Sequence, residues 1–156
     1  MLTLEVDGLL VRCFWLMRDG VQCGTFGMGR LSWTVEWDDL VASFGITLGP
    51  FQLFPKLQSY NFTLATADNP LIATTSEVGW LKPLVIDFEF SGKTYRIDRR
   101  KFFSYYMTDE SVELARVDKA DFWARKFGVV ITRDLPLPVT AFFLSTVVMR
   151  IRSGKP

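Results

Sequence analysis

The chain has 156 residues, of which 49% are hydrophobic and 15% aromatic, so it can build one domain with a substantial core and intrinsic disorder is excluded. Its 18 basic and 17 acidic residues leave a net charge of +1, which gives the whole molecule no attraction to nucleic acid or acidic membranes. Histidine is absent, and this removes the commonest general base and a common metal ligand.

Most of the chain predicts short β-strands joined by turns. In chain order we expect strands at residues 2–6, 9–17, 21–26, 31–37, 60–65, 71–75, 84–90, 93–97, 103–107, 112–117 and 127–132. The stretch from Asp38 to Phe44 allows a short helix or a loop, and residues 45–55, rich in glycine, proline and phenylalanine, are expected to be irregular. Many short strands with frequent turns favour a barrel or a sandwich. Because no linker or low-complexity segment interrupts the pattern, we expect a single domain over residues 1–156.

Three of the expected hairpins share one plan, in which an aromatic strand leads to an acidic turn and then to an apolar, a small and a polar residue. The turn aspartates are Asp19, Asp68 and Asp109, and the small residues that follow are Gly24, Ala73 and Ala115. We expect each small residue to let a neighbouring strand or helix approach closely. A two-residue turn at Asp19-Gly20 would place Cys23 opposite Leu16, a register in which Cys13 and Cys23 cannot form a disulfide.

The segment from Leu135 to Ile151, LPLPVTAFFLSTVVMRI, is the longest nearly uncharged run, with Arg150 as its only charge. As a helix beginning at Pro138, a favoured first helical residue, it has no polar face and must be enclosed by protein or lipid. Its apolar residues also recur at period two from Val139, which would suit a strand. We expect the helix, with Ser145 and Thr146 bonded back to carbonyl groups one turn earlier. The expected fold is therefore mainly β, a closed antiparallel barrel around a buried C-terminal hydrophobic helix.

Two segments resemble the tubby C-terminal-like superfamily, nearer to its scramblase-like and LURP-one-related branches than to tubby itself. They are YYMTDESVELARVDK, residues 105–119, and FWARKFGVVITRDLPLPVTAFFLSTVVMRI, residues 122–151. The resemblance implies a closed barrel threaded by the C-terminal helix, and a link to membrane lipids or protein partners. The scramblase-like cysteine cluster is missing, and the position of the acidic calcium segment holds only Asp134, beside Arg133, so neither acylation nor calcium binding is implied.

No group of residues predicts catalysis, a cofactor or a metal site. Ser91-Gly92-Lys93-Thr94 matches the end of a phosphate-binding loop, but that motif requires glycine where this chain has Asp87, and a hairpin turn explains the segment better. Asp87 and Glu89 share one strand face without a further ligand nearby, which argues against a metal site or a carboxylate pair for acid–base catalysis. The chain is predicted not to be an enzyme.

The best candidate for a binding site is a basic cluster made of Arg96, Arg99, Arg100, Lys101, Arg125 and Lys126. Neighbouring barrel strands would gather these residues into a rim that binds an anionic phospholipid headgroup, a membrane surface or a protein partner. The aromatic residues at 102–106 make a nucleic-acid platform conceivable but less favoured. The alternative is an ordinary solvated rim paired with aspartates.

The leading functional hypothesis is a non-enzymatic binding module that uses this basic rim. One alternative is a carrier of a small molecule or lipid, with a pocket beside the central helix. The other is a tail-anchored membrane protein, although residues 137–151 as a helix would measure only about 22 Å. Glu5 and Asp7 stand where a signal peptide would be basic and apolar, so we expect a cytoplasmic protein, at most peripheral at a membrane.

Overall fold

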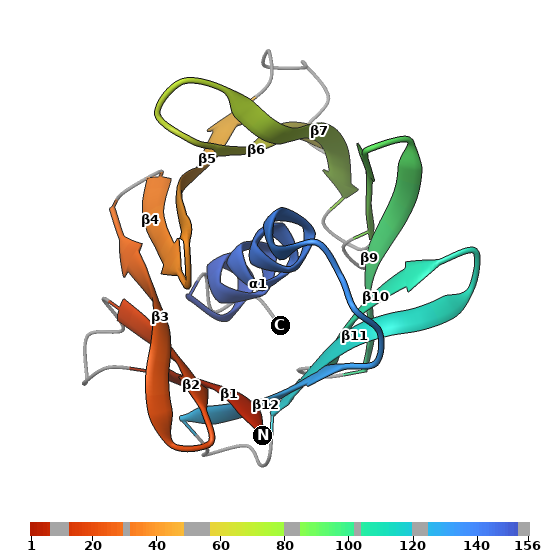
Figure 1. The fold of residues 1–156 in the computed structure, drawn as a ribbon. Helices are drawn as coiled ribbons and strands as arrows, with labels where there is room; N and C mark the ends of the chain where they lie inside the picture. The colour runs from red at the N-terminus through yellow and green to blue at the C-terminus, as the bar shows by residue number, and fades with distance from the viewer. Residues whose placement is uncertain are drawn as a thin grey trace.

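In the part of the chain that the structure describes, one antiparallel sheet curls around one helix (Figure 1). The computed structural model describes residues 1–6, 13–29, 32–48, 57–79, 85–101, 104–119 and 125–152, and of these it describes 28, 48, 57–59, 75–79 and 101 by their backbone alone. The predicted mainly-β class and the barrel around a buried C-terminal helix are both confirmed.

The elements follow one another as short strands and end in the helix. The strands are β1 (Leu2–Val6), β2 (Cys13–Arg18), β3 (Val21–Met28), β4 (Ser32–Trp37), β5 (Leu40–Leu48), β6 (Leu57–Ala65), β7 (Pro70–Gly79), β8 (Val85–Phe90), β9 (Lys93–Lys101), β10 (Ser104–Asp109), β11 (Val112–Lys119) and β12 (Lys126–Ile131). The helix is α1 (Leu137–Arg152).

The first and last strands pair and join the two halves of the barrel. The strand order is β7-β6-β5-β4-β3-β2-β1-β12-β11-β10-β9-β8, and Leu4 of β1 lies opposite Phe127 of β12. The edge strands β7 and β8 lie close together without a ladder of backbone hydrogen bonds between their described residues. Instead the Thr74 hydroxyl donates a hydrogen bond to the Asp87 carbonyl at 2.6 Å. The barrel is therefore nearly closed, with a single seam between β7 and β8 among the described strands.

Side chains alternate between the barrel interior and the solvent, as the period of a strand requires. In β4 exposed and buried residues alternate along the whole strand, and Trp33, Val35 and Trp37 form its inward face. Phe14 and Leu16 of β2 are likewise fully buried. Apolar side chains from all around the sheet line the interior. Exposing them to water would be unfavourable, so the interior has to be filled.

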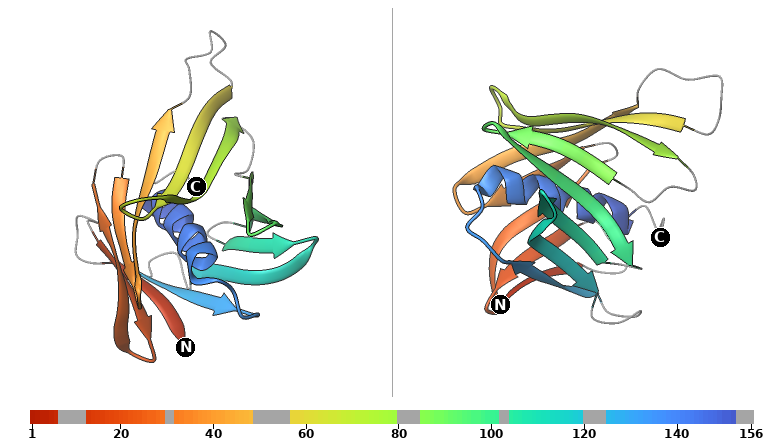
Figure 2. Two further views of the ribbon diagram at one scale, coloured as in Figure 1. Left: turned by 45° about the horizontal axis from the view of Figure 1, so that its top comes forward. Right: turned by 90° about the vertical axis from the view of Figure 1, so that its right-hand side faces the viewer.

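The helix α1 fills that interior and lies lengthwise inside the barrel (Figure 2). Every residue from Val139 to Val148 is buried, and the Phe142 ring packs against Phe44 and Phe88 with centroid distances of 5.7 and 4.7 Å. The strand alternative for this segment is wrong, because the space inside a ring of strands requires an element that is apolar on every side.

Two buried hydroxyl groups of α1 behave differently from each other. The Thr146 hydroxyl donates a hydrogen bond to the Phe142 carbonyl at 2.9 Å, which is the predicted bond to the preceding turn. The hydroxyl of Ser145 is fully buried and has no hydrogen-bond partner among the described residues, so the same prediction is wrong for Ser145.

The prediction of a short helix or loop from Asp38 to Phe44 is wrong, because β5 begins at Leu40. Asp38 has a φ of 49°, a left-handed conformation that aspartate tolerates better than most residues. A two-residue turn at Asp38 and Asp39 therefore returns the chain directly into β5, where Ala42 and Phe44 face the core. The expected irregular stretch also starts too early, since β5 continues to Leu48, and residues 49–55 lie outside the described chain.

A β-bulge changes the register expected for the first hairpin. Leu16 lies opposite Gly24, and not opposite Cys23, because the register shifts between Leu16 and Met17. Both cysteines are free, as predicted. A bulge inserts one extra residue on one strand and leaves it without a direct partner, and Cys23 is that residue here.

The three hairpins of the predicted internal repeat share a structural feature, because each contains a β-bulge. The register shifts one residue past Leu16, Leu64 and Met107, whose partners are Gly24, Ile72 and Ala115. A β-carbon added at Gly24 would lie 2.9 Å from the Glu36 carbonyl oxygen of the neighbouring strand, so the close approach predicted there is confirmed. At Ala73 it is wrong, because Ala73 is exposed and Ile72 takes the inward position.

Candidate functional site

The two ends of the barrel differ in their charges. One end, which we call the turn end, has the tight turns at Asp19-Gly20, Asp38-Asp39, Ser91-Gly92 and Glu110-Ser111, and the segment that leads into α1. At the other end β9 finishes, β12 begins and α1 ends, as the antiparallel registers require. We call this the basic end, defined by Arg99, Arg100, Lys101, Lys119, Arg125, Lys126, Arg150 and Arg152.

Acidic residues dominate the turn end. Its described acidic residues are Asp19, Asp38, Asp39, Asp68, Asp109, Glu110 and Asp134. Some are neutralised locally, because the N-terminal amino group pairs with Asp19 and Arg18 pairs with Asp38 at 3.2 Å. The molecule is nearly neutral as a whole, but acidic residues are in excess at the turn end, while at the basic end the basic residues outnumber nearby acidic ones such as Glu5, Asp98 and Asp118.

Arg96 does not belong to the basic end. It is exposed on the outer wall of β9, where its guanidinium donates two hydrogen bonds to the Asp87 carboxylate at 2.7 and 2.9 Å. These hydrogen bonds raise the pKa of Arg96 above its usual value. Thr108 of β10 lies opposite it, several residues before the end of β9. The structure therefore does not bring Arg96 together with the other predicted residues.

The end of β9 directs its basic residues to both faces of the sheet. Arg100 is exposed on the outside, 3.2 Å from the Asp98 carboxylate, with its guanidinium 4.9 Å from the centre of the Tyr106 ring. Arg99 is half-buried, lies opposite Tyr105 in the ladder and shares the inward face of Ile97. Lys101 ends the strand, and its side chain lies outside the described atoms.

The start of β12 brings Arg125 and Lys126 to the same end. The Lys126 amino group lies 2.7 Å from the Glu5 carboxylate of β1. Arg125 is exposed, and its carbonyl accepts a hydrogen bond from the Val6 amide at 3.0 Å. Five of the six predicted residues, all but Arg96, therefore come from the same end of the barrel, at the end of β9 and around the start of β12.

The last turn of α1 adds two arginines that the sequence interpretation did not include. Arg152 donates a hydrogen bond to the Gly29 carbonyl at 2.6 Å and lies 5.9 Å above the centre of the Trp33 ring. Arg150 is half-buried, and burial lowers its pKa. Basic residues in a last turn offset the partial negative charge of a helix C-terminus. This pattern in the sequence could have placed Arg150 and Arg152 at the end of the helix.

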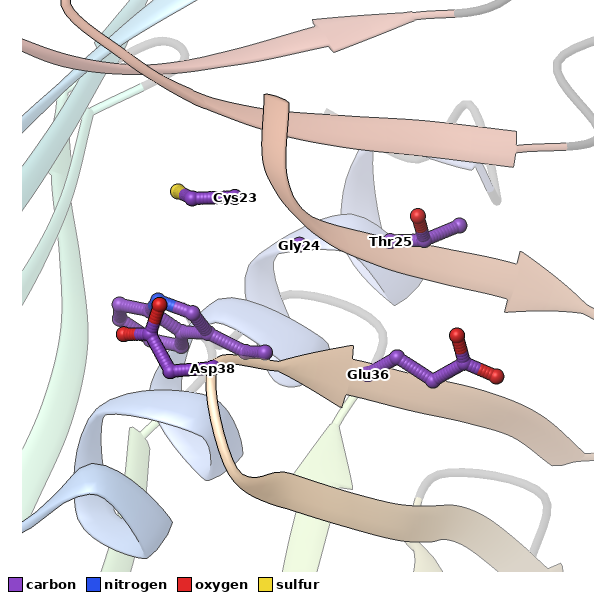
Figure 3. A pocket seen from close by; sticks show the side chains of 6 residues that line it. Cys23, Gly24, Thr25, Glu36 and Asp38 are labelled. Carbon is purple, nitrogen blue, oxygen red and sulfur yellow. The ribbon is translucent and has the colours of Figure 1, made fainter. Parts of the chain in front are cut away.

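A shallow pocket of about 240 Å³ lies at the turn end, beside Gly24 (Figure 3). The carboxylates of Glu36 and Asp38 point in opposite directions there, and the Cys23 thiol donates a hydrogen bond to the Leu16 carbonyl at 3.5 Å. Burial raises the pKa of Cys23, which keeps the thiol protonated and weakly nucleophilic. These side chains do not converge on a common point, and the described residues contain no group of three or more potential metal ligands.

A second pocket, of about 350 Å³, lies beside the start of α1. Its lining mixes apolar and charged side chains: Phe90, Ser91, Lys93, Tyr95, Asp109, Leu114, Arg133, Asp134, Leu135 and Pro136. Burial and the nearby charge of Asp109 raise the pKa of Tyr95, so its phenol stays neutral. The pocket has the size of a small-molecule site.

No family model, curated protein or solved structure matches this chain. Among the described residues, no helix combines the length and the apolar character that crossing a bilayer requires.

Proposed function

We propose that this barrel is a non-enzymatic binding module that holds anionic headgroups of membrane lipids at its basic end. The observation that carries the proposal is the excess of basic residues at one end, contributed by β9, the start of β12 and α1, while acidic residues are in excess at the other end. Each basic residue near an anionic membrane surface contributes about 1 kcal/mol to association. The turn end is repelled by the same surface, so the charge separation also orients the molecule.

The proposal accounts for a chain whose net charge is close to zero. A net charge of +1 gives almost no attraction at long range. At contact, however, only charges within about 10 Å of the surface act at ordinary ionic strength, and these belong to the basic end. Peripheral association with a membrane is the mode of binding that this arrangement supports.

We also retain the tubby-like kinship as a proposal. A nearly closed antiparallel barrel with a buried C-terminal helix is the architecture that the resemblance implies. The support concerns the architecture alone. Lipid binding rests on the basic end, independently of the kinship.

Vesicle flotation tests the proposed function with a charge-matched pair of variants. The double variant Arg100→Gln and Arg125→Gln removes two positive charges from the basic end and should weaken binding to anionic vesicles about thirtyfold, since each charge contributes about 1 kcal/mol. The control, Lys93→Gln and Arg133→Gln, removes two positive charges from the turn end and should bind like the parent chain. Raising the salt concentration should release the parent chain. Equal loss in both variants, or no binding by the parent, would reject the proposal.

A small-molecule carrier is the second candidate, and one observation favours it. The pocket of about 350 Å³ beside α1 offers apolar side chains such as Phe90 and Leu135 together with Lys93 and Arg133, a combination that suits a small amphipathic or anionic ligand. A small molecule that copurifies with the protein, seen by native mass spectrometry, would favour the carrier over the lipid-binding module.

A further inference from the structure

The pocket of about 350 Å³ at the turn end lies between three segments that are distant in the sequence. The β8–β9 hairpin, the β10–β11 hairpin and the segment that joins β12 to α1 each contribute lining residues. The apolar part of the lining consists of Phe90, Leu114, Leu135 and Pro136. Leu114 is buried, and Phe90 and Leu135 pack against the core, so the fold itself holds this apolar surface in place.

The Tyr95 ring connects the pocket with the barrel core. It is 4% exposed and stacks on Phe88 with the ring centroids 5.2 Å apart, and Phe88 in turn packs against Phe142 of α1. Among the residues that the structure describes, none forms a hydrogen bond with the Tyr95 hydroxyl. This buried residue therefore offers the pocket a donor and an acceptor that the protein does not use.

Four charged side chains line the same pocket, and they are Lys93, Asp109, Arg133 and Asp134. Lys93 lies opposite Phe90 in the ladder and shares the inward strand face with Tyr95. Asp109, at the end of β10, is near enough to Tyr95 to raise the pKa of its phenol, after the larger effect of burial. Within the described part of the chain, none of the four charged side chains has an ion-pair partner.

We propose that this pocket binds a small zwitterion with an apolar body, such as a free apolar amino acid. Asp109 and Asp134 bind its ammonium group. Lys93 and Arg133 bind its carboxylate, and the apolar lining takes its side chain. The inference goes beyond lipid binding at the basic end, and it specifies the ligand class for the carrier considered above as the second candidate.

The charges of the lining determine the charges of the ligand. Two cationic and two anionic side chains leave the lining with no net charge. A simple anion would be attracted by the cations and repelled by the carboxylates, and a simple cation would meet the reverse. A zwitterion brings an opposite charge to both kinds of side chain, and hydrogen bonds between charged groups are the strongest that a ligand can form here.

Isothermal titration of the purified full chain with three ligands of one shape tests the inference. Leucine carries both charges, N-acetylleucine lacks the ammonium group, and leucinamide lacks the carboxylate. We expect leucine to bind at millimolar concentration or below. Each analogue should bind about tenfold more weakly, the effect of losing one charged hydrogen bond.

Two variants assign the two charges of the ligand to their partners. Asp109→Asn should weaken leucine binding about tenfold without weakening N-acetylleucine, because that analogue has no ammonium group to lose. By the same reasoning, Lys93→Gln should weaken leucine about tenfold without weakening leucinamide. Asp109 is half-buried, so thermal melting checks the fold of its variant, and the exposed Lys93 provides the second test.

The controls are Asp39→Asn and Arg125→Gln, which make the same changes of charge at exposed residues outside the pocket. Both should bind leucine like the parent chain.

Equal binding of leucine and its two analogues, or no binding of leucine, would overturn the inference. An Asp109→Asn variant that binds like Asp39→Asn would overturn it as well. Tighter binding of N-acetylleucine than of leucine would also contradict it, and would leave the pocket as a carrier of a simple anion. None of these results changes the flotation test of the basic end, so the failure of one proposal is distinguishable from the failure of the other.

Discussion

Replacing Phe142 with alanine is expected to lower the free energy of unfolding by about 3–5 kcal/mol. The Phe142 ring is fully buried in the middle of α1, between Phe44 of β5 and Phe88 of β8. These two strands come from opposite halves of the sheet order and are not paired with each other, so the ring connects parts of the wall that the described backbone ladders do not join directly. Urea unfolding followed by circular dichroism measures the change, with the slope of the transition as a check on two-state behaviour.

The control for this prediction is Val41→Ala, which removes apolar atoms from an exposed position of β5. It should change the stability by no more than about 0.5 kcal/mol. A loss below about 1 kcal/mol for Phe142→Ala would mean that the space beside α1 is loosely packed, since well-packed cores do not tolerate cavities of this size so cheaply.

Replacing Leu4 with alanine should cost about 2–5 kcal/mol. Leu4 is fully buried on β1, where Leu16 of β2 and Phe127 of β12 lie opposite it. β1 joins the N-terminal strands to the C-terminal ones, so a cavity at this position weakens the contact that holds the two halves of the barrel together. Chemical denaturation again measures the loss.

The adjacent Glu5→Ala variant is the matched comparison for Leu4→Ala. Glu5 faces outward and pairs with Lys126 at 2.7 Å, and an exposed ion pair contributes no more than about 1 kcal/mol. Equal losses for the two variants would indicate that β1 has no defined inward face. That result would contradict the register between β1 and β12.

The architecture could be predicted from polarity alone. The segment from Val139 to Val148 has no polar face, so enclosure followed from the sequence, and period-two alternation marked the strands around it. The choice between helix and strand depended on Pro138, which lies in the first turn of α1. The strands alternate because one face of the sheet meets solvent and the other meets α1. The helix lacks a polar face because the sheet surrounds it.

The register of the strands and the conformation of the turns could not be predicted as the architecture could. The bulge after Leu16 adds one residue to a hairpin, and no residue type at Met17 or Cys23 requires it. The turn at Asp38 needs a left-handed residue, and aspartate there also fits a helix start, which is why the strand β5 was missed.

The candidate site was predicted in part, because linear spacing does not reveal distance along a strand. Arg96 and Lys101 are close in sequence, but an extended strand separates them by about 16 Å at 3.3 Å per residue, and Asp87 holds Arg96 on the outer wall. Arg150 and Arg152 were missed because their helix was interpreted as core. Only the fold shows that the helix ends where β9 ends and β12 begins.

Native-state hydrogen exchange of the α1 amides tests the central claim, that the C-terminal helix is the core of the barrel. The account predicts that amides from Phe143 to Val148 exchange only through global unfolding, with free energies equal to that from urea denaturation. Exchange of these amides through local opening, at free energies far below the global value, would contradict it.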